Sequence, residues 1–278
     1  MPERRTDTKR RQQVRRRRAV AAAVLALTLL LVVVTMTRGS HDETAPATLN
    51  PFAAATRIFP PAHLPYVAVA GRKHREVALT FDDGPGPYTA TLVRTLRRLH
   101  APGTFFQVGV TEHYFTDAEE LQRKDPLVTV GGHTVNHRRM DRLSRAEQAA
   151  EIDGVTDILT AAGQPAPTLF RPPYGAFNQT TLDLLRDRGM TMVLWSVDSH
   201  DYLRPGVDAI VANVLDNVKP GGIVLMHDAG GERSQTIEAL PRIVHALRAR
   251  GYTLVSVPQL LHDAPPPRKQ PKLGVGVG

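Results

Sequence analysis

The stretch EVALTFDDGP, residues 76–85, indicates how the rest of the chain is organised. Residues 76–81 form a mostly apolar run of six, which is typical of a strand buried on both faces. The run ends in Asp82 and Asp83 and is followed by a Gly-Pro turn. Parallel α/β folds gather their polar site residues at the carboxyl ends of such strands. The stretch therefore predicts both a fold class and the place of a site.

Outward from this stretch, apolar runs alternate with amphipathic segments. The expected strands are 76–81, 103–108, 127–130, 168–170, 191–197, 223–226 and 252–257. The expected helices are 88–100, 117–123, 144–162, 179–188, 207–218, 235–250 and 258–262. This alternation predicts a parallel sheet with helices outside it. Periodicity alone does not separate an open doubly wound sheet from a barrel.

The composition excludes several classes of site. The chain of 278 residues has no cysteine, which excludes disulfides, thiolate metal sites and a cysteine nucleophile. Any metal must be held by His, Asp or Glu. The net charge of +8 arises in residues 1–38, which carry ten of the 35 basic and two of the 27 acidic residues. The remaining chain is balanced, so we expect no nucleic-acid partner.

The N-terminus is typical of a membrane anchor. Residues 1–18 are rich in arginine, and residues 19–37 carry no charge. As a helix, the uncharged run spans about 28 Å, close to the hydrocarbon core of about 30 Å. Arginines before the run predict a cytoplasmic N-terminus and an extracellular body. We expect an uncleaved single-pass anchor in the cell membrane; the alternative is a cleaved signal peptide and a secreted protein.

The expected domain organisation has five parts. They are a basic cytoplasmic segment 1–18, a transmembrane signal-anchor 19–37, a stem or linker 38–75, a catalytic domain 76–262 and a flexible tail 263–278. We expect the protein to be a monomer.

Polar residues follow five of the expected strands. The two adjacent carboxylates of Asp82 and Asp83 repel each other, and a bound cation would relieve that repulsion. His133 and His137 are four residues apart, and neutral imidazoles suit zinc or a similar metal. Taken singly, these features also fit a solvated turn or unrelated surface histidines. Their recurrence at successive strand ends predicts one shared site.

These residues resemble the polysaccharide deacetylase family, the NodB-homology domain of carbohydrate esterase family 4. The resemblance covers about residues 76–262. Its motifs are TFDDGP at 80–85, H-T-x-x-H at 133–137, RPPYG at 171–175, D-S-x-D at 198–201 and L-x-H at 225–227. The resemblance implies a distorted (β/α)7-type barrel.

The resemblance also implies a metal centre and a base. Asp83, His133 and His137 would bind one divalent metal, which in this family is usually zinc. Asp82 would be the general base that activates water, and Arg171 would hold it in place.

Further roles follow from the same resemblance. His227 would be the general acid, oriented by Asp201. The backbone N–H of Tyr174, in the turn that contains Pro173, would stabilise the oxyanion.

Two more residues, Tyr202 and Leu225, would line the substrate pocket. The family usually has Trp where this chain has Tyr202, and often Pro where it has Arg138. The first departure affects the wall beside the acid. Among other residues, we expect Trp195 in the barrel core or, as the alternative, at the border of the cleft, and His200 facing solvent.

The sequence thus predicts a membrane-anchored, metal-dependent N-deacetylase acting on an extracellular N-acetylated polysaccharide. Peptidoglycan amino sugars are the leading substrate, followed by chitin oligomers. An O-acetyl esterase acting on xylan or another glycan remains an alternative, as does a catalytically silent glycan-binding domain.

Overall fold

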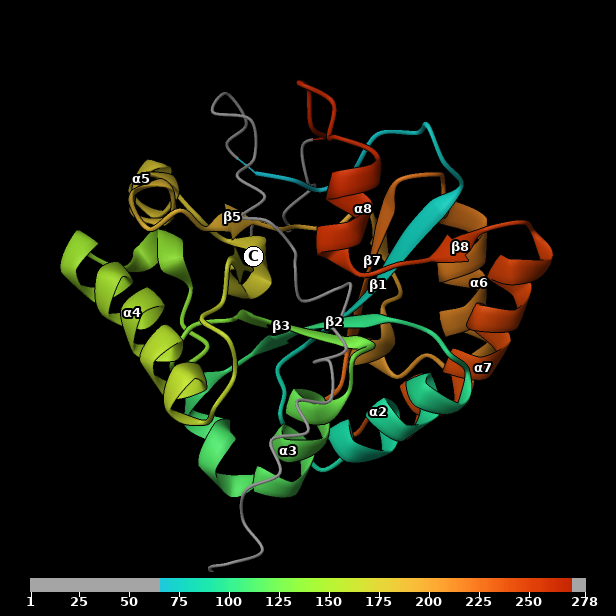
Figure 1. Ribbon diagram of the computed structural model, residues 1–278, viewed down its shortest axis with the longest axis horizontal. Helices are drawn as coiled ribbons and strands as arrows, with labels where there is room; N and C mark the ends of the chain where they lie inside the picture. The colour runs from blue at the N-terminus through green and yellow to red at the C-terminus, as the bar shows by residue number, and fades with distance from the viewer. Residues whose placement is uncertain (1–65, 272–278) are drawn as a thin grey trace, which may run out of the picture. The chain divides into compact units, whose positions relative to one another are not determined.

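The computed structural model describes residues 66–271. Their centre is one sheet in which every paired strand runs parallel to its neighbour (Figure 1). The strands are β1 (Glu76–Asp82), β2 (Gly103–Gln107), β3 (Val128–Gly132), β4 (Leu169–Phe170), β5 (Thr191–Met192), β6 (Val197–Asp198), β7 (Gly222–His227) and β8 (Thr253–Leu254). Their order is β5-β4-β3-β2-β1-β7-β6, with β8 beside β1.

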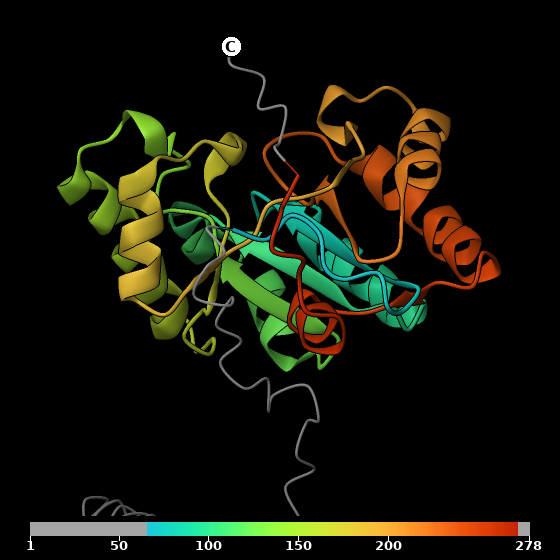
Figure 2. The same ribbon diagram turned by 90° about the horizontal axis from the view of Figure 1, so that it is seen from above.

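Helices follow the strands, so the predicted parallel α/β architecture is confirmed. Most of the helices cover the outside of the sheet, whereas the last one packs against its inner face. The helices are α2 (Thr89–Arg98), α3 (Thr116–Lys124), α4 (Arg145–Ala161), α5 (Gln179–Asp187), α6 (Val207–Asn217), α7 (Ser234–Ala249) and α8 (Val257–Asp263). Short 3₁₀ helices are η1 (Gly109–Tyr114), η2 (Met140–Arg142), η3 (Pro173–Gly175) and η4 (Asp201–Leu203). Figures 1 and 2 show α4 and α5 on one flank and α6 and α7 on the other.

Local sequence signals explain where some of these helices begin. Before α4, the Ser144 hydroxyl accepts a hydrogen bond from the Glu147 N–H, and the Glu147 carboxylate accepts one from the Ser144 N–H. Such a capping box satisfies N–H groups that the first turn leaves free, and a cap contributes about 1 kcal/mol. The spacing Ser-x-x-Glu predicted this start.

The two faces of the sheet bury different sets of residues. Leu79 and Phe81 of β1 pack on the outer face with residues of α2, α6 and α7. Ala78 lies on the inner face with Phe106 and with residues of α8. Because side chains alternate along a strand, Asp82 also belongs to the inner face. The inside of the sheet is therefore apolar near α8 and polar at the carboxyl ends of the strands.

The sheet is a half-barrel whose two edges are joined by one short segment. The edges are β5 and β6, and only residues 193–196 separate them in the chain. Within this segment, the Val193 N–H donates to the carbonyl of Phe170 in β4 at 2.9 Å. The Ser196 N–H donates to the carbonyl of Ile223 in β7 at 3.0 Å. The expected single strand 191–197 is therefore wrong: the chain must leave β5 to cross to the other edge.

Residues 66–70 lie in the gap between the two edges of the half-barrel, β5 and β6. The Val67 N–H donates to the Met192 carbonyl at 2.9 Å, and the Leu194 N–H donates to the Val67 carbonyl at 2.7 Å. On the other side, the Ala70 N–H donates to the Gly221 carbonyl at 2.8 Å. Val67 is fully buried. The expected linker 38–75 therefore needs correction, because its residues 66–70 are part of the folded unit.

The beginning of the expected tail, 263–278, is also part of the fold. Asp263 ends α8, and the Gln270 side chain accepts hydrogen bonds from the N–H groups of Ala68 and Val69 at 2.8 and 3.0 Å. These N–H groups would otherwise be unpaired on the free edge of a strand-like segment. The tail up to residue 271 is thus held by the segment that fills the gap.

No helix within residues 66–271 has both the length and the apolar character needed to cross a bilayer. The predicted basic segment 1–18 and signal-anchor 19–37 lie outside the described residues.

Candidate active site

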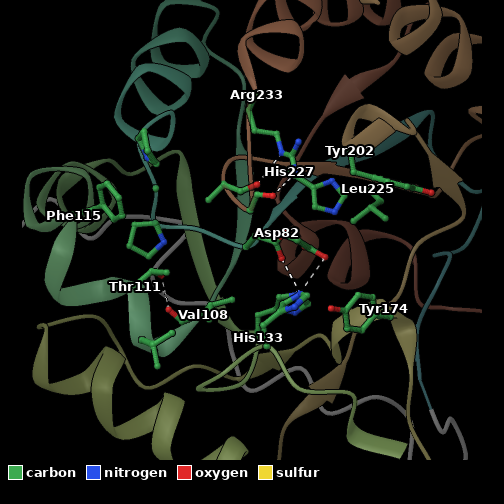
Figure 3. A pocket seen from close by; sticks show the side chains of 18 of the residues that line it. Asp82, Val108, Thr111, Phe115, His133, Tyr174, Tyr202, Leu225, His227 and Arg233 are labelled. Carbon is green, nitrogen blue, oxygen red and sulfur yellow. Dashed lines mark hydrogen bonds and ion pairs between the residues drawn. The ribbon is translucent and has the colours of Figure 1, made fainter. Parts of the chain in front are cut away.

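The carboxyl ends of the strands open into a cavity of ≈ 1010 Å³. Titratable side chains lie at its centre, and mostly apolar or aromatic side chains form its walls (Figure 3). The residues that line it are Asp82, Asp83, Pro85, Gly86, Pro87, Val108, Val110, Thr111, Phe115, His133, Asn136, His137, Tyr174, Trp195, Asp198, His200, Tyr202, Leu225, His227, Ala229, Gly230 and Arg233.

Three of these side chains form a candidate metal centre. One ligand atom each from Asp83, His133 and His137 lies within 4.8 Å of the other two. The Asp83 Oδ1 is 3.0 Å from the His137 Nε2 and 3.6 Å from the His133 Nε2. One oxygen and two imidazole nitrogens are a donor set that suits zinc or a similar divalent metal.

The orientation of His133 also fits metal binding. Its Nδ1 lies 2.6 Å from the carbonyl oxygen of Arg171. Because a carbonyl can only accept, Nδ1 carries the proton and the Nε2 lone pair is free to face Asp83. Ligand histidines are usually fixed in this way by a second hydrogen bond.

The charge on Asp83 also favours metal binding. Burial alone would raise the pKa of Asp83, but the neighbouring imidazoles of His133 and His137 outweigh it and hold that pKa well below its usual range. The carboxylate is therefore ionised at neutral pH and ready to bind a cation.

Three residues of the site have left-handed backbone conformations. The φ angles of Asp83, His137 and Tyr174 are 76°, 54° and 61°. Such conformations cost non-glycine residues on the order of 1–3 kcal/mol each and persist where the surroundings enforce them. Strain of this kind is common at functional sites, and here two of the three strained residues, Asp83 and His137, are candidate metal ligands.

Arg171, which follows β4, holds Asp82. Its Nη1 donates to the Asp82 Oδ1 at 2.7 Å and to the Thr80 hydroxyl at 2.8 Å. Its Nε and Nη2 donate to carbonyls of the segment that crosses the gap, those of Val193 and Leu194, both at 3.1 Å. The guanidinium is fully buried. Arg171 does not line the cavity, so it holds the Asp82 carboxylate from the side away from it.

His227 is paired with the buried carboxylate of Asp201. Burial would lower the pKa of His227, but the hydrogen bond and charge of Asp201, with the charges of Asp82 and Asp83, raise it to about 9. Burial would likewise raise the pKa of Asp201, yet the His227 and Thr236 hydrogen bonds keep it low. The pair therefore exists as imidazolium and carboxylate at neutral pH.

The base and acid candidates are neighbours across the sheet. Asp82 in β1 and His227 in β7 are register partners, so their side chains point to the same face. Figure 3 shows both beside His133 in the cavity. A proton acceptor and a proton donor thus flank the candidate metal centre.

The remaining predicted residues lie around this centre. Tyr174 is exposed in the cavity wall, and the centroid of its ring lies 4.9 Å from that of the His137 ring. The Tyr202 ring lies 5.5 Å from that of His227, and Leu225 lines the cavity. Pro173 differs from these: it is buried and does not line the cavity, and it begins the η3 turn that presents Tyr174.

Sequence reasoning missed one wall of the cavity. Val108, Thr111 and Phe115, within and beside η1, form it (Figure 3). Residues 109–114 have neither helical nor strand periodicity, so no pattern pointed to them. Trp195 is partly buried, packs against the core and also lines the cavity, so it lies where the two predicted positions meet.

Fold and site together define a parallel α/β protein with a candidate metal centre between a carboxylate and an imidazolium. A family model described as polysaccharide deacetylase matches residues 70–193. The chain is 39% identical over 203 residues to a chitooligosaccharide deacetylase of Bradyrhizobium sp. (strain ANU 289), covering 67% of this chain and 90% of that protein. It is 38% identical over 197 residues to a peptidoglycan-N-acetylglucosamine deacetylase of Bacillus cereus, covering 66% and 87%.

A solved structure agrees with these relatives. The Bc1960 peptidoglycan N-acetylglucosamine deacetylase has a TM-score of 0.68 and 29% identity, over 70% of this chain and 92% of that one. The chain belongs to the polysaccharide deacetylase family, and it is an enzyme of that kind, a hydrolase.

Proposed function

We propose that this enzyme removes N-acetyl groups from an extracellular N-acetylated glycan, with peptidoglycan amino sugars as its leading substrate. Two similar proteins are named for peptidoglycan N-acetylglucosamine or chitooligosaccharide, which share the N-acetylated sugar. The substrate is assigned from these names together with the expected export of the domain.

The observation that carries the proposal is the placement of Asp82 and His227 on register-paired positions beside the metal-ligand triad. An acetamide is a poor electrophile, and its amine leaves only when protonated. Hydrolysis therefore needs one group that takes a proton from water and another that gives a proton to nitrogen. Asp82, whose Oδ1 pairs with the Arg171 Nη1 at 2.7 Å, is placed for the first task.

His227 suits the second task. The charge of Asp201, which faces Nδ1, favours the imidazolium, and the proton on Nε2 can pass to the departing amine. The alkoxide released by an O-acetyl ester needs less proton donation than an amine does. A group that is protonated at neutral pH, as His227 is, therefore suits amide hydrolysis better than ester hydrolysis.

Asp83, His133 and His137 would hold the divalent metal, which we propose is zinc. When bound there, it would polarise the acetyl carbonyl and acidify water. The N–H groups of Gly175 and Ala176 close the η3 turn onto Pro172 and Pro173. The Tyr174 N–H is not used in this closure, and we propose that it donates to the developing oxyanion.

We further propose that the chain is a membrane-anchored monomer with its catalytic domain outside the cell. The support is the arginine-rich segment 1–18 followed by the uncharged run 19–37. Cleavage after that run would instead release a secreted enzyme.

Acetate release by the purified full-length chain tests the proposal. Peptidoglycan, chitooligosaccharides and acetylated xylan are compared with added zinc, with chelator and with the Asp82→Asn variant. Metal-dependent acetate from N-acetylated glycans is expected. Acetate from xylan alone would make the enzyme an esterase, and bound metal without any acetate would favour a silent glycan-binding domain.

A further inference from the structure

The loop after β1 and the loop after β7 interlock through glycines. A Cβ placed on Gly84 would lie 2.3 Å from the Asp228 Oδ2, and one on Gly86 would lie 2.4 Å from the Ala229 Cβ. In the opposite direction, a Cβ on Gly230 would lie 2.2 Å from the Asp83 Oδ2. Each loop thus leaves room for an aspartate of the other.

We propose that Gly230 is a positioning residue for Asp83, and so sets the affinity of the metal centre. The Asp83 Oδ2 lies where a side chain at position 230 would begin. Its Oδ1 lies 3.0 Å from the His137 Nε2 and 3.6 Å from the His133 Nε2. The inference rests on the proposed metal role of Asp83 and is independent of the substrate.

Gly230 can act as a fixed wall because its own loop is braced. The buried Arg233 guanidinium donates to the carbonyls of Ala229 at 2.8 Å, Gly230 at 3.1 Å and Glu232 at 2.9 Å. The planar guanidinium thereby holds three carbonyls of one loop at once. Without this brace, the loop could move away from Asp83.

The loop that contains Asp83 is attached to the loop that contains Gly230. Asp228 is fully buried, and its Oδ2 accepts a hydrogen bond from the Thr89 hydroxyl. That hydroxyl accepts one from the Gly86 N–H at 2.7 Å. The Val108 N–H donates to the Gly84 carbonyl at 2.8 Å. Neither loop can therefore shift to accommodate an added atom at position 230.

A simpler reading is that Gly230 is a glycine only because its φ is 69°. Gly206 separates the two explanations, because its φ is 98° and a Cβ there would meet nothing within 4 Å. Alanine at position 206 adds backbone strain without a contact. Alanine at position 230 adds both.

The test measures zinc affinity of the full-length Gly230→Ala and Gly206→Ala variants by competition with a chromophoric chelator, beside their thermal unfolding. Changing residues that orient metal ligands typically costs about 10–100-fold in affinity. We expect a loss of that size for Gly230→Ala and none for Gly206→Ala. The cobalt-substituted Gly230→Ala protein should also show altered d–d absorption, because Asp83 is displaced.

Arg233→Lys is the second variant, since Gly230→Ala could unfold the loop. Lysine keeps the charge but cannot bond three carbonyls in one plane, so zinc affinity should fall here as well. Unchanged zinc affinity in folded Gly230→Ala, or in Arg233→Lys if the first does not fold, would overturn the inference. Zinc affinity is measured without substrate, so a wrong choice of glycan would leave this result intact.

Discussion

Asp201 holds His227 at two points, since one carboxylate oxygen lies 2.7 Å from the ring Nδ1 and the other accepts the backbone N–H of His227 at 2.8 Å. The residue is thus fixed in both orientation and charge. Its ring proton is directed to Asp201, which leaves Nε2 facing the cavity as the proton donor.

The first prediction concerns the titration of His227. Its pKa of about 9 exceeds the ordinary 6.5, so its contribution to stability is complete below about pH 6.5 and is lost as the pH rises through about 9. Asp201→Asn should lower this pKa and move the alkaline limb of kcat/KM to lower pH. NMR titration of the ring gives the pKa directly, and the exposed Asp208→Asn serves as the control. An unmoved limb would remove His227 from the role of acid.

The second prediction concerns the base. Asp82→Asn should keep the zinc but reduce kcat by about 10²–10⁴-fold, the usual contribution of a general base. The variant also leaves Arg171 without a counter-charge, so stability must be measured in parallel. Thr80→Val is the matched control, because it removes another Arg171 partner and leaves the carboxylate. Near-normal turnover in Asp82→Asn would contradict the assignment.

The third prediction concerns the metal. The full-length chain should bind one zinc, and zinc at 100 times its Kd should raise the free energy of unfolding by about 2.7 kcal/mol. His137→Ala should abolish this stabilisation. His113→Ala should not, because His113 packs against Tyr114 outside the triad. Elemental analysis with thermal unfolding measures both effects, and equal binding by the two variants would rule out the proposed ligand set.

The fourth prediction concerns a buried carboxyl outside the triad. Burial, with the charges of Glu119 and Asp228, raises the pKa of Glu112 to about 8. An acid with a raised pKa destabilises the fold increasingly as the pH rises from its ordinary 4.5 to about 8. Glu112→Gln should therefore stabilise the protein more at pH 9 than at pH 5. Denaturant unfolding at both pH values measures this, and the exposed Glu120→Gln should show no such dependence.

The fifth prediction concerns the segment in the gap of the half-barrel. Val67→Ala removes fully buried methyl groups and should lower the free energy of unfolding by about 1–2 kcal/mol. Val110→Ala is the same substitution at a site 41% exposed and should have little effect. A loss in Val67→Ala as small as that in Val110→Ala would mean that Val67 adds nothing to the stability of the core.

Much of the fold and of the site could be predicted because the signals are local. An apolar run followed by Asp82 and Asp83 marks a strand end wherever the strand lies, and strand ends of a parallel sheet converge. The split of 191–197 and the docking of Val67 depend on the curvature of the whole sheet, which no short window contains. The wall at Thr111 and the brace at Arg233 were missed for a related reason: their roles come from contacts with distant loops.

The segment that fills the gap has a consequence for the timing of folding. Val67 lies near the beginning of the described residues, yet it pairs with Val193. Val69, two residues further on, pairs with Gly222, and its N–H donates to the Gln270 side chain. Within residues 66–271, the first residues to be synthesised must therefore wait for the last before they can make these contacts. A chain interrupted before Gln270 would leave the N–H groups of Ala68 and Val69 without this partner, and we expect the domain to complete its fold only after residue 270 has been made.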